Sequence, residues 1–167
     1  VGTKVIDVCE DRADCFAILD PVEYSKNVVD ATTRANARNS NYAAVYWPWI
    51  KINDSQVAGV QRWVPPSVMV SGVYAFNDKV SHEWFAPAGL NRGTIDTAVM
   101  AERKLTQADR DTLYDSNVNP IATFPGQGVT IFGQKTLQKK ASALDRINIR
   151  RLLIKVKKFI ASSSRFL

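Results

Sequence analysis

The order of apolar and polar positions predicts alternating helices and strands along the first part of the chain. Residues 1–10 have the pattern of the last turns of a helix, and residues 15–19 form a continuous apolar run of strand length. Residues 23–38 have the apolar spacing of a surface helix, and residues 42–52 are an aromatic and β-branched run interrupted by Pro48. A buried strand between helices is typical of a parallel or mixed sheet, so we predict an α/β (α+β) fold with a mixed sheet flanked by helices.

The second part of the chain continues with a helix, a packed loop, a short helix and a hairpin. Helical spacing over residues 67–76 follows two prolines that can begin a helix. Residues 84–93 combine Pro, Gly and Asn with aromatics, which predicts an ordered loop buried by Trp84 and Phe85. Residues 107–115 suit a short polar helix. Strands over 118–124 and 129–132, joined by a Gly/Pro turn, predict a β-hairpin.

The last helix is predicted over residues 145–162, with Asp145 as N-cap or first-turn acid. One arc at helical spacing is apolar, and we expect it to be buried: Ile149, Leu152, Leu153, Val156, Phe159 and Ile160. Basic side chains project elsewhere: Arg150, Arg151, Lys155, Lys157 and Lys158. Ile154 lies on the charged side and is expected to mark a contact with a neighbouring chain.

Composition excludes several classes of protein. The chain has 167 residues, of which 46% are hydrophobic and 23% charged, so it can bury the core of one ordinary domain or two small ones. Its apolar runs are all shorter than the roughly 18 residues of a membrane-spanning helix. Cys9 and Cys15, with a single histidine, cannot assemble a His/Cys zinc cluster, and we interpret both as reduced structural thiols. The chain begins with Val1 inside an expected helix, so we interpret it as a fragment.

The residues predict no catalytic site, metal site or cofactor. His82 stands between Ser81 and Glu83 in a polar loop and lacks the orienting partners of a nucleophilic triad. Asp109 and Asp111 are two apart on a helix and point to different faces. The glycines lack the spacing and the neighbouring lysine of phosphate-binding loops. We therefore expect a protein that is not an enzyme.

The net charge of +6 is concentrated in the last third of the chain, which leaves two non-enzymatic functions open. In the first, the basic helix binds nucleic acid, which favours exposed aromatics beside the cations. In the second, the helix meets an acidic protein surface and the hairpin receives strands from other chains. We favour the second because the four tryptophans, the last of them Trp84, lie in the near-neutral part of the chain.

Several ordered blocks carry a resemblance to a known family. They are Trp-Phe-Ala-Pro-Ala-Gly-Leu-Asn-Arg-Gly at 84–93, Asn-Val-Asn-Pro-Ile at 117–121, Phe-Pro-Gly-Gln-Gly at 124–128, Phe-Gly-Gln-Lys-Thr-Leu at 132–137 and Asp-Arg-Ile-Asn-Ile-Arg-Arg-Leu at 145–152. In order and spacing they resemble the C-terminal core region of contractile bacteriophage tail sheath proteins, and the resemblance runs from about residue 12 to residue 167. One departure is Gln134-Lys135, where many relatives have Ala-Arg.

The resemblance implies a structural subunit that polymerises helically around a tail tube and contracts to drive the tube through the host envelope. It implies that residues 1–104 end a core domain with a subtilisin-like fold, and that residues 105–167 begin a small hairpin-plus-helix C-terminal domain. The implied partners are neighbouring sheath subunits, the tail tube protein, and baseplate and tail terminator proteins, without membrane or direct nucleic acid. The implied location is the virion, after assembly in the host cytoplasm. Sheaths of bacteriocin particles or type VI secretion remain alternatives.

The resemblance also assigns roles to residues. In the family, arms of neighbouring subunits add strands to a small C-terminal sheet, which makes the hairpin the implied acceptor through Val118, Ile121, Thr123, Val129 and Ile131. The basic residues of the last helix are the candidates for the tube-facing wall. Structural roles are implied for the motif residues Trp84, Pro87, Gly89, Asn91, Arg92, Gly93, Asn119, Pro120, Gly126, Gly128, Asp145 and Arg146.

Overall fold

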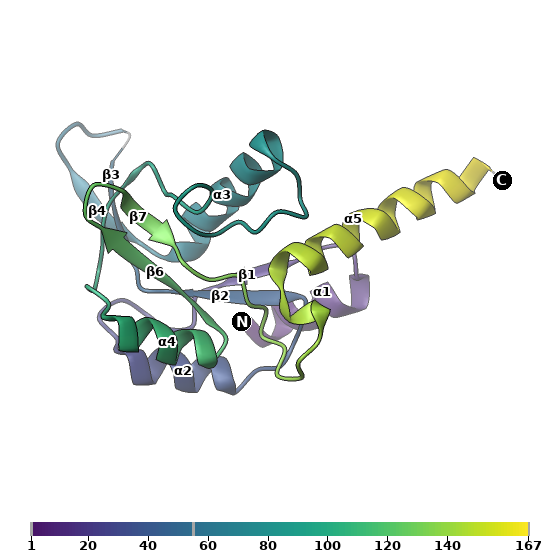
Figure 1. The fold of residues 1–167 in the computed structure, drawn as a ribbon, viewed down its shortest axis with the longest axis horizontal. Coiled ribbons are helices and arrows are strands. Elements are labelled where there is room, and N and C mark those ends of the chain that lie inside the picture. Colours follow the sequence, from purple (N-terminus) through teal and green to yellow (C-terminus); the bar gives the residue numbers. More distant parts are fainter. Residues whose placement is uncertain (1, 55, 167) are drawn as a thin grey trace.

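The computed structural model describes residues 2–54 and 56–166 (Figure 1). The elements follow in the order α1 (Gly2–Arg12), β1 (Ala17–Leu19), α2 (Val28–Asn36), β2 (Ala43–Trp47), β3 (Ile50–Asn53), β4 (Gln61–Val64), α3 (Pro66–Val80), β5 (Ala98–Ala101), α4 (Gln107–Asp115), β6 (Val118–Phe124), β7 (Gly128–Ile131), the 3₁₀ turn η1 (Ala143–Asp145), α5 (Ile147–Ser163) and the 3₁₀ turn η2 (Ser164–Phe166).

A four-stranded mixed sheet with the order β1-β2-β6-β7 forms the centre of the fold. β1, β2 and β6 are parallel, and β7 returns antiparallel to β6. Successive residues of β2 point to opposite faces: Val45 packs among α1, α2 and α4, whereas Tyr46 packs against α3 and the start of α5. Helices therefore cover both faces of the sheet (Figure 1), which confirms the predicted α/β class.

A second sheet, with the antiparallel order β4-β3-β5, lies at the end of the molecule opposite the C-terminus (Figure 1). Pro48 and Trp49 alone separate β2 from β3, so the chain passes directly from one sheet to the other. The run predicted over residues 42–52 is thus two strands. Thr123 of β6 links the sheets, because its Oγ1 accepts a hydrogen bond of 3.2 Å from the Ala101 N–H of β5.

The boundary expected at residue 104 lies between segments that share one sheet and one buried cluster in this structure. β6, which belongs to the second expected domain, pairs with β2 of the first in the interior of one sheet. Leu113 of α4 shares a buried cluster with Ile6 of α1 and Val45 of β2. β6 and α4 therefore pack together with β2 and α1, and the two-domain division stays a prediction.

Several element ends differ from the sequence prediction for local reasons. The helix predicted over 23–38 begins only at Val28, because Asn27 and Asp30 form a capping box. The helix predicted over 67–76 continues to Val80. Asp145 does not cap the last helix: it lies in η1, and α5 begins at Ile147 after the N-cap residue Arg146, whose side chain makes no capping hydrogen bond.

The loop over residues 84–93 closes the outer edge of β7. Ile131 donates to the Gly93 carbonyl (2.8 Å) and accepts from the Gly89 N–H (2.8 Å), and Ile95 donates to the Val129 carbonyl (2.9 Å). Arg92 Nε donates to the Ala86 carbonyl at 3.2 Å. Main-chain contacts, and not buried aromatics, thus attach the loop to the sheet.

The expected burial of two aromatic residues in this loop is wrong. Trp84 is 48% exposed and Phe85 38% exposed. Trp84 stacks on His82, with 4.2 Å between the ring centroids, and the Arg92 guanidinium lies 4.9 Å from the Phe85 ring centroid. Pro87 and Gly93 are the buried members of the motif, whereas Asn91 is exposed.

We expect Gly93→Ala to lower the free energy of unfolding by about 2 kcal/mol. A Cβ at this position would lie 2.6 Å from the Ile131 carbonyl oxygen and 2.9 Å from the Ala88 Cα, both main-chain atoms. The matched control is Gly72→Ala in α3, where a Cβ meets nothing within 4 Å and helix propensity favours Ala by about 0.5–1 kcal/mol. Urea denaturation of both variants measures the difference, and equal midpoints would contradict the close contact at Gly93.

Candidate assembly surface around helix α5

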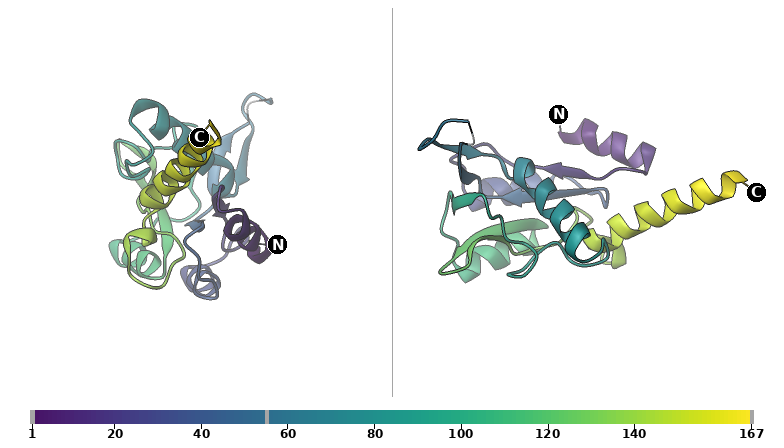
Figure 2. Two further views of the ribbon diagram at one scale, coloured as in Figure 1. Left: turned by 90° about the vertical axis from the view of Figure 1, so that its right-hand side faces the viewer. Right: turned by 90° about the horizontal axis from the view of Figure 1, so that it is seen from above.

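Helix α5 begins on the sheet and then leaves the body of the molecule, so that the C-terminal end projects (Figures 1 and 2). Its buried residues, Ile147, Arg150 and Ile154, all lie in the first half of the helix. Phe159 and Ile160 in the second half are 70% and 59% exposed. The first two turns are therefore the anchor of α5, and the last turns are a free surface among the described residues.

The face of α5 that packs is not the one predicted from the apolar arc. Leu153, Val156, Phe159 and Ile160 are exposed, whereas Ile154, expected to meet a neighbouring chain, is 9% exposed against this chain's own body. The packed face carries basic residues, which the body accommodates through cation–π contacts. The Arg150 guanidinium lies 4.2 Å from the Tyr42 ring centroid, and the Arg151 guanidinium lies 4.5 Å from the Tyr74 ring centroid.

Ion pairs hold the same face of α5 to the body. Arg151 pairs with Asp78 of α3 through both of its terminal nitrogens, with 3.0 Å between Nη1 and Oδ1. One turn later, Lys155 pairs with Glu83, and this hydrogen bond lowers the pKa of the Glu83 carboxyl below its ordinary value. Arg151 is 15% exposed and Lys155 is 63% exposed, so we assign most of the stabilisation to the Arg151–Asp78 pair.

These contacts change the interpretation of the predicted tube-facing residues. Arg150, Arg151 and Lys155 are engaged within the chain, by a ring, a carboxylate or both. Lys157 and Lys158 are exposed and form no ion pair with the described residues. The pKa of the Asp14 carboxyl is lowered chiefly by its hydrogen bond with Arg12, with a smaller contribution from the Lys158 charge. The predicted basic face is therefore divided between an internal anchor and two exposed lysines.

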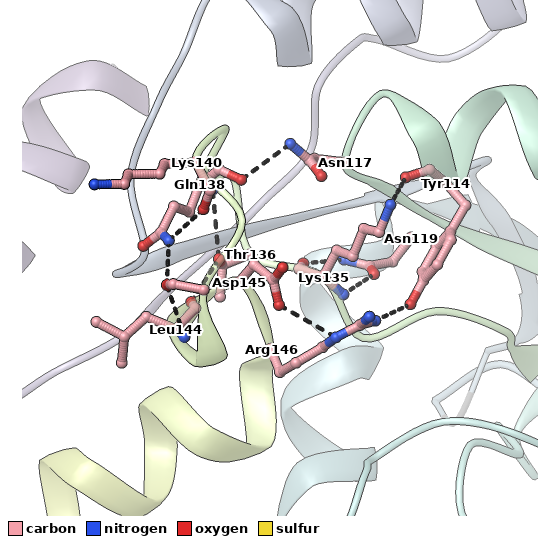
Figure 3. Close-up of polar contacts among 11 residues, drawn as sticks. Tyr114, Asn117, Asn119, Lys135, Thr136, Gln138, Lys140, Leu144, Asp145 and Arg146 are labelled. Carbon is pink, nitrogen blue, oxygen red and sulfur yellow. Dashed lines mark hydrogen bonds and ion pairs between the residues drawn. The ribbon is translucent and has the colours of Figure 1, made fainter.

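A polar network fixes the start of α5 (Figure 3). The fully buried Asn119 of β6 donates from Nδ2 to the Val45 carbonyl (3.0 Å) and to the Lys135 carbonyl (2.8 Å), and its Oδ1 accepts from the Lys135 N–H (2.7 Å). Gly133 lies so close that a Cβ there would be 2.9 Å from Asn119 Oδ1. One side chain thus joins β2, β6 and the segment that leads to α5.

Tyr114 of α4 is the second centre of this network (Figure 3). Lys135 Nζ donates to the Tyr114 carbonyl at 2.9 Å and lies 4.2 Å from its ring centroid, and Arg146 Nη1 donates to the Tyr114 hydroxyl at 2.6 Å. Arg146 also pairs with Asp145 at 3.2 Å. Lys135 therefore serves as an internal contact between α4 and the base of α5.

The predicted strand-accepting hairpin has little free edge in this structure. Val118, Ile121, Val129 and Ile131 are buried, with β2 on one side of β6 and residues 89–95 on the outer side of β7. Its turn is as predicted, with Gly126 at φ 74° and Gly128 at φ 73°, values that favour glycine. Pro120 is buried at the end of the β2–β6 pairing, opposite Trp47.

The residues considered for chemistry have structural contacts. Asp109 forms the capping box of α4 with Thr106, and the hydrogen bonds from Thr106 lower the pKa of its carboxyl. Within residues 2–54 and 56–166, no group of three or more His, Cys, Asp or Glu is placed to hold a metal ion. No helix in that part of the chain is long and apolar enough to cross a membrane.

Sequence reasoning missed the partners of the basic face, namely Tyr42, Tyr74, Asp78 and Glu83. They lie far from α5 in the sequence, so no local spacing connects them to it. One signal was present: Ile154 on the charged side of the helix is difficult to explain unless that side packs. Arg150 and Arg151, one turn before it, would then need aromatic or acidic neighbours.

A sequence model of the family described as phage tail sheath protein central domain matches residues 1–137. The chain belongs to this tail sheath family. The match crosses residue 104 without a break, in agreement with the single sheet that joins both sides of that position.

Relatives of the sheath chain include two phage proteins. The tail sheath protein of Vibrio phage KVP40 is 43% identical over 105 residues, which cover 63% of this chain and 16% of the relative. The tail sheath protein of Enterobacteria phage T4 is 32% identical over 187 aligned residues, covering 99% of this chain and 28% of the relative. The chain thus spans less than a third of either curated relative.

Solved structures of contractile assemblies share the fold of the sheath chain. The PVC sheath complex of an extracellular contractile injection system, in the contracted state, is 28% identical with a TM-score of 0.74, covering 90% of this chain and 41% of that chain. A chain of the anti-feeding prophage baseplate in the contracted state has a TM-score of 0.79 at 20% identity, covering 98% of this chain and 42% of its own, and this likeness supports the fold alone.

We expect Asn119→Ala to lower the free energy of unfolding by about 3 kcal/mol, because it removes three hydrogen bonds from a buried amide to the main chain of Val45 and Lys135. The matched control is Asn91→Ala, an exposed asparagine of the loop, with a loss below about 0.5 kcal/mol. Equilibrium denaturation measures both. A loss at Asn119 no larger than that at Asn91 would show that the network does not hold the base of α5.

We expect Arg151→Gln to increase hydrogen exchange in the first half of α5, where the helix packs, and to cost about 2 kcal/mol, since it leaves Asp78 unpaired. Lys157→Gln, six residues along the same helix and unpaired among the described residues, is the control and should change neither quantity. Hydrogen–deuterium exchange followed by mass spectrometry measures the protection. Unchanged exchange in Arg151→Gln would mean that the ion pair does not anchor the helix.

Proposed function

We propose that this chain is part of a structural subunit of a contractile phage tail sheath. The supporting observation is the fold and 28% identity shared with the contracted PVC sheath complex over 90% of the chain. The subunit polymerises helically around a tail tube, and contraction of the polymer drives the tube through the host envelope for genome delivery. This work is mechanical, so the proposal includes no catalysed reaction and no cofactor.

The proposed partners are neighbouring sheath subunits, the tail tube protein, and the baseplate and tail terminator proteins. The proposed location is the virion tail, after assembly in the host cytoplasm. A tube contact on α5 is proposed only through Lys157 and Lys158, since Arg150, Arg151 and Lys155 contact this chain's own residues. Exposed ion pairs contribute about 0–1 kcal/mol each, so such contacts act through repetition along the sheath.

Strand exchange between subunits remains part of the proposal, but it requires that a segment already bonded to β7 be displaced. An arm that pairs with β7 has to displace residues 89–95, whose main chain already bonds to Val129 and Ile131. Otherwise the arm pairs at another strand. The main-chain groups of β7 therefore do not provide an open acceptor in the conformation described.

The test is electron microscopy of the full-length protein expressed with and without its tail tube protein. We expect striated tubes, or hollow sheaths of uniform diameter, when both proteins are present. Monodisperse particles under both conditions, together with a salt-dependent shift of DNA in a gel, would overturn the sheath proposal in favour of nucleic-acid binding.

The same assay tests the lysines. We expect Lys157→Gln combined with Lys158→Gln to reduce sheath assembly on isolated tubes in low salt, where screening is weak. The matched control combines Lys139→Gln with Lys140→Gln, two exposed lysines before η1. Equal assembly by both double variants would remove the tube contact and leave the sheath function itself untouched.

A further inference from the structure

Two thiols meet where α1 ends and the chain turns towards β1. The sulfur atoms of Cys9 and Cys15 are 3.5 Å apart, and both cysteines are free. Cys9 is 5% exposed on the inner face of α1. Cys15 is half-buried and lines a groove of about 260 Å³ that also contains Asp14 and Lys158. One sulfur is thus inside the core and the other is accessible from the groove.

Main-chain hydrogen bonds and an ion pair, rather than the contact between the sulfur atoms, hold the turn between Cys9 and Cys15 in place. Ala13 has φ 55°, and its N–H donates to the Cys9 carbonyl at 2.9 Å, which ends α1 in a left-handed turn. Arg12 and Asp14 form a two-fold ion pair across the turn, at 2.9 and 3.0 Å. After this turn, Ala17 starts β1 by donating to the Tyr42 carbonyl at 2.8 Å. The contact between the thiols is therefore fixed by the main chain on both sides.

The two thiols differ in their surroundings. Burial, followed by the hydrogen bond and the charge of Cys15, raises the pKa of the Cys9 thiol to about 11. Cys9 is therefore a protonated thiol at neutral pH, and a small reagent reaches Cys15 first through the groove. This order of access suits a pair in which one cysteine reacts with an oxidant and the other resolves the product.

We propose that Cys9 and Cys15 form a dithiol site that a small disulfide, such as oxidised glutathione, converts into an intramolecular disulfide. Cys15 loses its proton to water and attacks, as the thiolate, one sulfur of the oxidant, whose S–S bond breaks and releases a thiolate that takes up a proton. Cys9 then loses its proton and attacks Cys15 Sγ, which breaks the mixed disulfide and releases the second thiol. Two electrons and two protons leave the protein, and the oxidant is reduced to two thiols.

The consequence is a covalent link between a peripheral helix and the edge of the central sheet. Among the described strands, β1 is at the edge of the sheet and pairs with β2, and α1 packs on it through the cluster that contains Cys9 and Ala17. The disulfide closes a short loop at this corner of the fold. It acts on the free energy of unfolding of α1 and β1. The groove beside Cys15 is also lined by Asp78 and Arg151, which anchor α5.

Trypsin provides a direct test, because it cleaves after Arg12, between the two cysteines. The full-length native protein is incubated with oxidised glutathione, alkylated and digested without reduction. We expect peptides 5–12 and 13–26 to leave as one linked species that reduction separates, with a matching loss of both alkylated peptides. Recovery of both peptides singly, with Cys15 either alkylated or still joined to glutathione, would overturn the proposal.

Single variants establish the order of the steps. Cys9→Ser should stop the reaction at the glutathione adduct of Cys15, whereas Cys15→Ser should leave the buried Cys9 unmodified in the native protein. If Cys9 in the Cys15→Ser variant formed the adduct as fast as Cys15 in the Cys9→Ser variant, Cys15 would not be the entry point. Circular dichroism of each variant shows that the fold is retained before the reaction is compared.

Discussion

The buried amide of Asn119 is the contact on which the arrangement of this chain depends. A polar side chain without exposed surface is costly unless its groups are paired, and the Asn119 amide accepts one main-chain hydrogen bond and donates two. Its partners belong to β2 and to the segment after β7, so the amide joins the parallel sheet to the chain that leads into α5. The close approach of Gly133 to Asn119 excludes a larger residue at that position.

The direction of α5 follows from this base. Ile147 donates to the Gln134 carbonyl, Arg146 reaches Tyr114, and Arg151 reaches Asp78, so α4, the network segment and α3 each constrain the first turns. The second half of α5 is exposed to solvent and projects from the body of the molecule (Figure 2). A helix held at one end transmits small changes at its base to larger displacements at its tip, and its orientation is therefore set by the first turns together with their partners in α3 and α4.

Much of the fold could be predicted from the sequence, because the signals are local. Residues 107–115 and 118–124 have the ends that their periodicity and turn residues predict, and the turn glycines Gly126 and Gly128 have positive φ values. The errors concern contacts between distant segments. The hydrophobic arc of α5 predicted burial on the side that is exposed, since spacing cannot show that Tyr42 and Tyr74 accept Arg150 and Arg151. The closure of β7 by residues 89–95 is likewise a pairing between segments more than 30 residues apart.

The basic residues of α5 fall into two groups that differ in their sensitivity to salt, and this difference bears on the proposed assembly. Charges near the body, such as Arg151, are partly shielded from solvent and have their carboxylate within the chain, so salt weakens them less than fully exposed pairs. Lys157 and Lys158, farther along the same helix, remain open to solvent and are sensitive to salt. Salt weakens the internal Arg151–Asp78 pair less than it weakens contacts made by Lys157 and Lys158. The subunit can therefore keep its own shape while its contacts with partners form and break. This separation suits the proposed sheath, a polymer that rearranges without unfolding its subunits.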